Sequence, residues 1–174
     1  TSSKAWPSSK LSRSIAVLPT DQLEDYAPVK KLGPDALEIA ADEFAGNALM
    51  TRGSVKDALL DQKVVAGIGN AYADEILFEA RLSPFVKVKD AGEDGVDQVY
   101  RHIVPTLERA IAARAAGEYV FGLGKALGLS KKLDQMRVHN KEGEPCPNCG
   151  APVKLVEKSG RGTFYCATCQ PAVG

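Results

Sequence analysis

Apolar residues recur at helical spacing along much of the chain after Gly33. The first such segment opens at Pro34, a residue that suits the first position of a helix, and continues to Phe44. The next begins with Ser54 and Asp57, which have the spacing of a capping box, and leads into further apolar positions. We therefore expect one helix from Pro34 and a second from Ser54.

The turn Ala66–Asn70 contains two glycines and separates the second helix from a third, expected over residues 71–80. The expected core positions of this third helix are Tyr72, Ile76, Leu77 and Phe78. The segment Gly92–Gly95 predicts a loop, and a long helix should follow over residues 96–116, with a bend at Pro105. We expect most of these apolar residues to be buried in the hydrophobic core.

Strand patterns occur only near the two ends of the chain. Ser14–Leu18 is either the last strand of a sheet that is otherwise missing or an extended arm packed on the helical body. Near the C-terminus, Val153–Glu157 and Thr163–Tyr165 outline a hairpin, with its turn at Lys158–Gly162. Residues 117–132, with several glycines and lysines, predict a loop or a weak helix.

Length and composition limit the possible class of protein and its domain organisation. With 174 residues, 44% of them hydrophobic and 25% charged, the chain has the composition of a globular protein rather than that of a disordered, fibrous or disulfide-rich one. We expect a tail with a remnant strand over residues 1–30, a helical domain over 31–142 and a small module over 143–174. No segment predicts a membrane span or a secretory signal, so we expect a location in the cytoplasm and nucleoid, or in the nucleus of a eukaryote.

The charge is unevenly distributed, although the 22 basic and 22 acidic residues cancel. Residues 120–174 hold eight basic and four acidic side chains, a net charge of +4, so residues 1–119 carry −4. A cationic C-terminal region can hold a polyanion, and a solvated lysine-rich face explains the charge equally well.

All four cysteines lie in one short window, as two Cys-x-x-Cys pairs separated by sixteen residues. The four are Cys146, Cys149, Cys166 and Cys169. This spacing is typical of a tetrahedral zinc site, and a site closed by four thiolates is structural rather than catalytic. Two disulfides are the alternative, but the lack of a signal peptide fits a reducing compartment.

Two features near these motifs are suited to binding a phosphate group. Asn70 follows Gly67 and Gly69 and is well placed as the N-cap of the third helix, whose free N–H groups and dipole would attract an anion. Arg161 stands between two glycines at the tip of the expected hairpin, where its guanidinium could form two parallel bonds to phosphate oxygens. Taken alone, the glycines could be purely structural and Arg161 a solvated turn residue.

Several segments together resemble one family. Leu59–Gln62 and Ala66–Phe78 closely resemble the helix–two-turn–helix signature of formamidopyrimidine-DNA glycosylases and endonuclease VIII, and Gly33–Leu37 resembles the segment that opens that domain. Gly143–Pro147 and Gly160–Gln170 resemble the family's terminal zinc finger. One small-subunit ribosomal protein and the type VI topoisomerases share the first motif but not the finger. The resemblance implies a mainly α fold, with a helix–two-turn–helix domain followed by a β-hairpin zinc finger with four cysteine ligands.

The resemblance also implies a partner and its contacts. In the family, the asparagine that matches Asn70 and the arginine that matches Arg161 hold phosphates beside the lesion, and the lysine that matches Lys56 lies near the DNA-binding cleft. We therefore expect a monomer that binds double-stranded DNA, damaged or abasic, through Asn70, Arg161, Lys56, Gly67 and Gly69, with one structural Zn²⁺. The segment over residues 117–132 matches the place where some members carry a lid.

The sequence departs from the family at the catalytic residues. Family catalysis uses an N-terminal proline followed by glutamate, on a β-sandwich domain, whereas this sequence begins Thr1–Ser2–Ser3. We assign no catalytic residue and expect binding without chemistry. Arg137–Lys141 stands where many members have a Val-Tyr-Gly-Arg run, and the lid segment lacks the usual Thr-Thr-Leu-Arg stretch, so the lesion preference does not transfer.

Two other functions remain open. One is a DNA glycosylase and abasic-site lyase that uses another amine, such as the α-amino group of Thr1, whose ordinary pKa is about 8, or Lys56. Such chemistry needs a positioned acid or base, and Asp74 and Glu75 are expected to serve the helix surface or the fold. The other is a zinc-ribbon adaptor for protein partners, which would not bind DNA.

Overall fold

The structure is a computed structural model. It describes residues 19–23, 25–115, 136–158 and 160–171. The chain divides into two compact units, Thr1–Lys31 and Leu32–Gly174. The described part of the first unit contains two short 3-10 helices, Thr20–Gln22 and Val29–Lys31. The expected strand Ser14–Leu18 and the segment over residues 117–132 lie outside the described residues.

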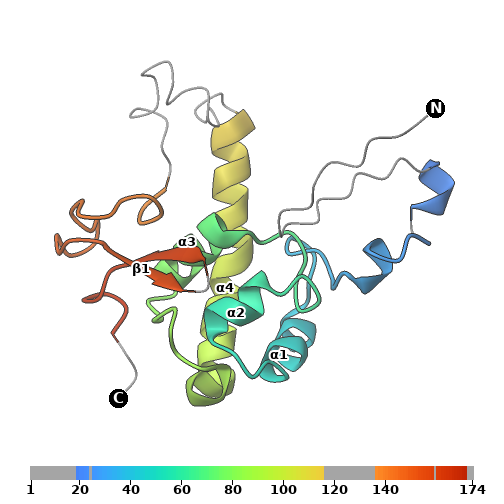
Figure 1. Cartoon of the computed structure of the whole chain (residues 1–174), viewed down its shortest axis with the longest axis horizontal. Coiled ribbons are helices and arrows are strands. Elements are labelled where there is room, and N and C mark those ends of the chain that lie inside the picture. The colour runs from blue at the N-terminus through green and yellow to red at the C-terminus, as the bar shows by residue number, and fades with distance from the viewer. Residues whose placement is uncertain (1–18, 24, 116–135, 159, 172–174) are drawn as a thin grey trace, which may run out of the picture. The chain divides into compact units, whose positions relative to one another are not determined.

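The described part of the second unit consists of four α-helices and one β-hairpin (Figure 1). The elements are α1 (Ala41–Leu49), α2 (Val55–Leu60), α3 (Asn70–Glu79), α4 (Val88–Ala115), β1 (Lys154–Lys158) and β2 (Arg161–Tyr165). Helix α4 contacts the other three helices, and β2 contacts α3. Helix α3 therefore lies between α4 and the hairpin, which confirms the expected mainly α fold with a terminal hairpin module.

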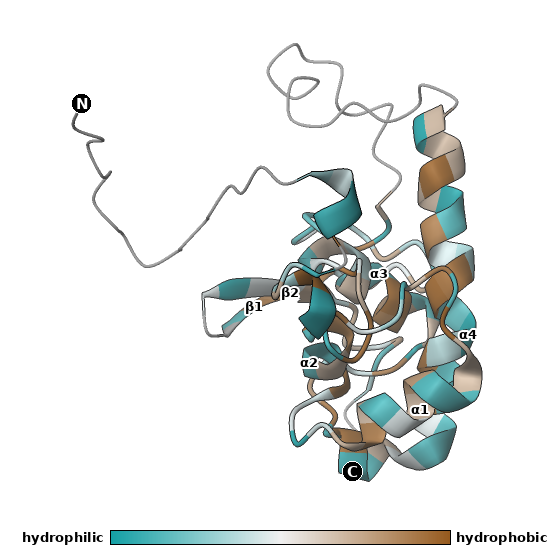
Figure 2. Cartoon of the chain, turned by 90° about the vertical axis from the view of Figure 1, so that its right-hand side faces the viewer, coloured by the Kyte–Doolittle hydropathy of each residue, from teal (hydrophilic) through white to brown (hydrophobic). Residues whose placement is uncertain are grey.

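Apolar side chains from all four helices form the main core. Apolar and polar residues alternate along α4 in Figure 2. Leu59, Ile76, Leu77 and Ile103 are fully buried there. A second, smaller core joins Phe78 of α3 to side chains of the cysteine module, including Val138 and Val153. The expected core positions Ile76, Leu77 and Phe78 are confirmed, and Tyr72 packs partly buried against the main core. Within the described residues no helix is both long and apolar enough to cross a membrane.

The first helix begins later than the sequence predicts, at Ala41 instead of Pro34. Residues 33–36 instead pair with residues 62–66, with a parallel bridge between Asp35 and Ala66: Gly33 donates to the Gln62 carbonyl, and Ala36 donates to the Ala66 carbonyl. The approach is so close that a Cβ at Gly33 would collide with the carbonyl oxygen of Lys63. The prediction was wrong because this pairing depends on a distant segment, which local periodicity does not reveal.

The start of α2 agrees with the prediction, whereas the expected loop at Gly92–Gly95 and the start of α4 were wrong. Ser54 and Asp57 form the expected capping box at the start of α2: the Asp57 N–H donates to Ser54 Oγ and the Ser54 N–H to Asp57 Oδ2. Helix α4 begins at Val88, before the expected loop, which is reduced to one non-helical residue, Gly92, with φ of 64°. Pro105 lies inside α4 without interrupting it.

The hairpin is tighter than expected. Strand β1 pairs antiparallel with β2, and Lys158 lies opposite Arg161, so only residues 159 and 160 connect the strands. Gly160 has a φ of 73°, a conformation that suits glycine at such a turn. Arg161 therefore begins β2 and does not lie in the turn itself.

Candidate nucleic-acid interface and zinc centre

The four cysteine sulfurs converge on one point. Each pair of ligand atoms lies within 4.8 Å, with Cys146 Sγ 3.8 Å from Cys169 Sγ and Cys149 Sγ 3.5 Å from Cys166 Sγ. A tetrahedral zinc ion with Zn–S bonds of about 2.3 Å requires sulfur separations of about 3.8 Å. The donor set therefore fits one structural zinc ion, which would supply stability that this small module cannot obtain from its core.

Hydrogen bonds shape the two knuckles and attach the module to the helices. The Cys146 N–H donates to the Ala151 carbonyl, and the Cys166 N–H donates to Gln170 Oε1 at 3.0 Å. Gln170 is buried, and its Nε2 donates to the carbonyl of Leu82, just beyond α3, at 2.9 Å. Gln170 thus fixes the second knuckle against the helical domain, a role that no spacing in the sequence indicates.

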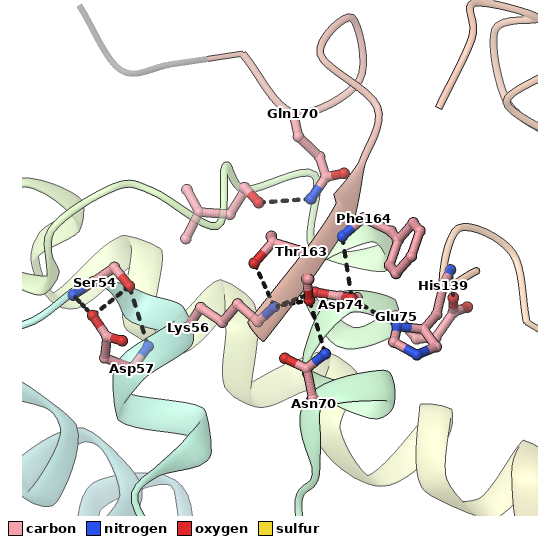
Figure 3. Close-up of polar contacts among 12 residues, drawn as sticks. Ser54, Lys56, Asp57, Asn70, Asp74, Glu75, His139, Thr163, Phe164 and Gln170 are labelled. Carbon is pink, nitrogen blue, oxygen red and sulfur yellow. Dashed lines mark hydrogen bonds and ion pairs between the residues drawn. The ribbon is translucent and has the colours of Figure 1, made fainter. Parts of the chain in front are cut away.

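A hydrogen bond joins the glycine turn to the finger hairpin. Asn70 Nδ2 donates to the carbonyl of Gly162 in β2 at 2.8 Å (Figure 3). The N-cap of α3 is Gly69, and Asn70 is the first helical residue, so the expected N-cap role of Asn70 was wrong. The Asn70 amide bonds across to the hairpin instead, and Arg161, next to Gly162, is exposed.

The glycine turn is held by one side chain. Gln62 Nε2 donates to the Ile68 carbonyl at 3.0 Å and to the Leu60 carbonyl at 3.3 Å, and Gln62 Oε1 accepts the N–H of Gly67 at 3.0 Å. Gly67 has a φ of 101°, which an L side chain rarely adopts, so glycine is required there. The turn therefore presents the start of α3 in a defined orientation.

Lys56 is buried beneath this junction, with only 7% of its side chain exposed. Its ammonium group lies 2.6 Å from Asp74 Oδ1 and donates to Thr163 Oγ1 at 2.8 Å. Asp74 Oδ2 in turn accepts from the Phe164 N–H at 3.2 Å and lies 2.8 Å from His139 Nδ1 (Figure 3). The expected contact residues Lys56 and Asn70 thus meet at strand β2.

The neighbouring carboxylate, Glu75, holds the segment that leads into the finger. Its two oxygens accept the N–H groups of Arg137, Val138 and His139, each at 2.9 Å. Burial raises the pKa of Glu75, and the three N–H donors oppose that shift. Asp74 and Glu75 are both buried, so the expectation that they serve the fold is confirmed and the surface alternative is excluded.

Arg137 ties the finger to the helices on the solvent side. Its guanidinium makes a two-oxygen contact with Glu79 of α3 at 2.8 and 2.9 Å, and a 2.7 Å bond to Asn148 Oδ1 in the first knuckle. It also lies over the Phe78 ring, 5.2 Å from the centroid. Burial alone would raise the pKa of Glu79, but the bonds to Arg137 and Arg109 lower its pKa overall.

Sequence reasoning missed Arg137, His139 and Asp74 as a group because they converge from distant segments.

The geometry defines a class of protein: a helix–two-turn–helix domain with a terminal zinc finger packed on its third helix. A family model described as the formamidopyrimidine-DNA glycosylase H2TH domain matches residues 32–121. A second, described as a zinc finger found in FPG and IleRS, matches residues 143–172. The chain belongs to the formamidopyrimidine-DNA glycosylase family, which confirms the resemblance read from the sequence.

Comparisons with individual relatives support this family membership. The chain is 38% identical over 146 residues to the formamidopyrimidine-DNA glycosylase of Listeria innocua, covering 82% of this chain and 52% of the relative. It is also 38% identical over 141 residues to an uncharacterized formamidopyrimidine-DNA glycosylase-like protein of Mycobacterium tuberculosis, covering 81% of this chain and 85% of that relative. The Lactococcus lactis Fpg in complex with abasic-site DNA has a TM-score of 0.73 at 30% identity, covering 87% of this chain and 56% of that chain. Apart from the M. tuberculosis protein, the chain spans about half the length of these relatives.

Proposed function

We propose that this chain binds duplex DNA at damaged or abasic sites, as a component of base excision repair, and performs no chemistry of its own. The observation that carries the proposal is the hydrogen bond between Asn70 and Gly162. It joins the start of α3 to strand β2, so that Asn70 and the neighbouring Arg161 belong to one continuous surface. A DNA backbone crossing this junction would meet both residues.

The groups at this surface suit phosphate. An amide nitrogen carries two N–H groups, and Asn70 uses one of them on Gly162, so the other can donate to a phosphate oxygen. Gly67 and Gly69 shape the start of α3, where the helix dipole favours an anion. The exposed guanidinium of Arg161 can form two parallel bonds to phosphate oxygens. Lys56 lies beneath them, with its charge paired to Asp74.

The proposed absence of catalysis rests on the environment of Lys56. An imine-forming lysine must reach the sugar carbon of an abasic site and must lose its proton before it can attack. Lys56 is buried and its ammonium group is engaged by Asp74 and Thr163. The other candidate amine, that of Thr1, lies outside the described residues. The alternative, a lyase that uses another amine, therefore needs a direct test.

Borohydride trapping on a duplex with one abasic site separates these functions. We expect the full chain to retard this duplex on a native gel and to form no covalent adduct after borohydride reduction. A covalent protein–DNA band would show that an amine of this chain forms an imine, and the lyase alternative would replace the proposal. Absence of any retardation at low salt would favour the zinc-ribbon adaptor for protein partners.

A further inference from the structure

The carboxylate of Asp74 is the point at which three separate segments of the chain meet. Its side chain is fully buried. One oxygen pairs with Lys56 from α2, at 2.6 Å; the other pairs with His139, at 2.8 Å, and accepts the N–H of Phe164 in β2, at 3.2 Å. Helix α3 thereby holds α2, the segment before the finger and the finger hairpin through one side chain (Figure 3).

Strand β2 is fixed at three consecutive residues by this network. Gly162 accepts from Asn70 at 2.8 Å, Thr163 accepts from Lys56 at 2.8 Å, and Phe164 donates to Asp74. The Phe164 ring also packs edge-on against His139, with 4.9 Å between ring centroids. Arg161 directly precedes these three residues, so its position follows from theirs.

Burying this much charge is a poor way to gain stability. Removing a carboxylate and an ammonium group from water is costly, and an apolar cluster of similar volume is often as stable. What the charged cluster supplies is a defined geometry, because Lys56, His139 and the Phe164 N–H all converge on the one carboxylate of Asp74. A binding site needs its groups held within about 0.5 Å of the productive arrangement.

We propose that Asp74 is a positioning residue: it sets strand β2 on α3 so that Arg161 lies at the correct distance from Asn70 to share one DNA backbone. The inference rests on the proposed function, since it concerns how the same surface is held. In this account Lys56 acts through Asp74 and Thr163 and not by touching a phosphate.

A double-mutant cycle on duplex affinity tests this role in the full chain. Asp74→Asn keeps the size of the side chain and removes its charge. We expect it to weaken binding of an abasic-site duplex about tenfold when Arg161 is present, and less than about twofold in the Arg161→Ala background. The matched control is Asp97→Asn, the same change on an exposed carboxylate of α4, which should have no effect in either background.

The cycle distinguishes positioning from general stability. Equal losses in the two backgrounds, or no loss in either, would overturn the inference. If Asp74→Asn loses zinc or fails to fold, His139→Phe decides the question, because it removes one Asp74 partner and keeps a ring against Phe164. Coupling between His139→Phe and Arg161→Ala would support the inference, and additivity would overturn it.

Failure of the proposed function gives a different pattern. If the unaltered chain does not bind the duplex, or if Arg161→Ala binds as tightly as the unaltered chain, the DNA-binding proposal falls and this inference falls with it. If the unaltered chain binds and Arg161→Ala weakens it, while Asp74→Asn shows no coupling, only the positioning role is overturned.

Discussion

At the scale of single residues, two consecutive carboxylates on α3 connect the helices to the finger. Both contact His139, but they bind different groups: Asp74 pairs with the side chains of Lys56 and His139 and one N–H of β2, whereas Glu75 accepts three backbone N–H groups. A residue that satisfies three backbone donors cannot be shortened without leaving them unpaired. The path of the chain through residues 137–139 therefore depends on Glu75.

Glu75→Ala should lower the free energy of unfolding by about 3 kcal/mol, because several partly buried N–H groups would lose their acceptor. The measurement is urea denaturation of the zinc-loaded protein. Glu108→Ala, on an exposed position of α4, is the control and should change the free energy of unfolding by less than about 0.5 kcal/mol. A Glu75→Ala variant as stable as this control would contradict the role assigned to Glu75.

At this scale the sequence predicted which residues belong to the site better than it predicted the contacts between them. The four cysteines could be assigned to zinc because thiolate ligands at this spacing carry their own geometry. The partners of Lys56 and Asn70 could not be predicted, because both bind strand β2, which lies far away along the chain. Gln170 was visible only as part of the finger motif, although its amide holds the finger to the helices.

At the scale of secondary structure, local signals decided where the predictions succeeded. The capping box at Ser54 and Asp57 is entirely local, and the structure contains it. The error at Pro34 has the opposite cause, because residues 33–36 pair with residues 62–66 across the domain. A proline that suits a helix start also suits an extended segment, so only the tertiary contact distinguishes the two.

Ser54→Ala should destabilise the protein by about 1 kcal/mol, the usual cost of losing an N-cap hydroxyl. The Ser54 hydroxyl accepts the Asp57 N–H at 3.2 Å and donates to Asp57 Oδ2 at 2.8 Å, and both bonds are lost in the variant. Thermal unfolding followed by circular dichroism measures the effect. Ser54→Thr retains the hydroxyl and should keep most of the stability, so equal losses in the two variants would argue against a capping role.

At the scale of the whole molecule, the finger and the helices form one compact unit rather than two. The expected boundary near residue 143 follows the cysteine motif, but contacts cross it at Gln170, at Arg137 and at strand β2. The finger's small core also includes Phe78 of α3. Zinc binding and the shape of the proposed DNA surface are therefore connected through these contacts.

Removal of zinc should unfold the finger while most of the helical signal remains, because the main core is formed by the helices and the segments between them and includes no finger residue. Affinity for an abasic-site duplex should fall to that of nonspecific binding, and added Zn²⁺ should restore it. Parallel circular dichroism and fluorescence titrations with and without a chelator make the comparison. Unchanged affinity after complete zinc removal would show that the finger takes no part in binding.

The proposed binding of DNA depends most directly on Arg161 meeting a phosphate. The measurement is a fluorescence titration of an abasic-site duplex over a range of salt concentrations, with the unaltered chain, Arg161→Ala and, as a matched loss of charge on α4, Arg101→Ala. Each phosphate contact contributes about 0.9 to the slope of log affinity against log salt, so Arg161→Ala should flatten the slope by about one unit. Arg101→Ala should leave it unchanged. An Arg161→Ala variant with the slope of the unaltered chain would contradict the account.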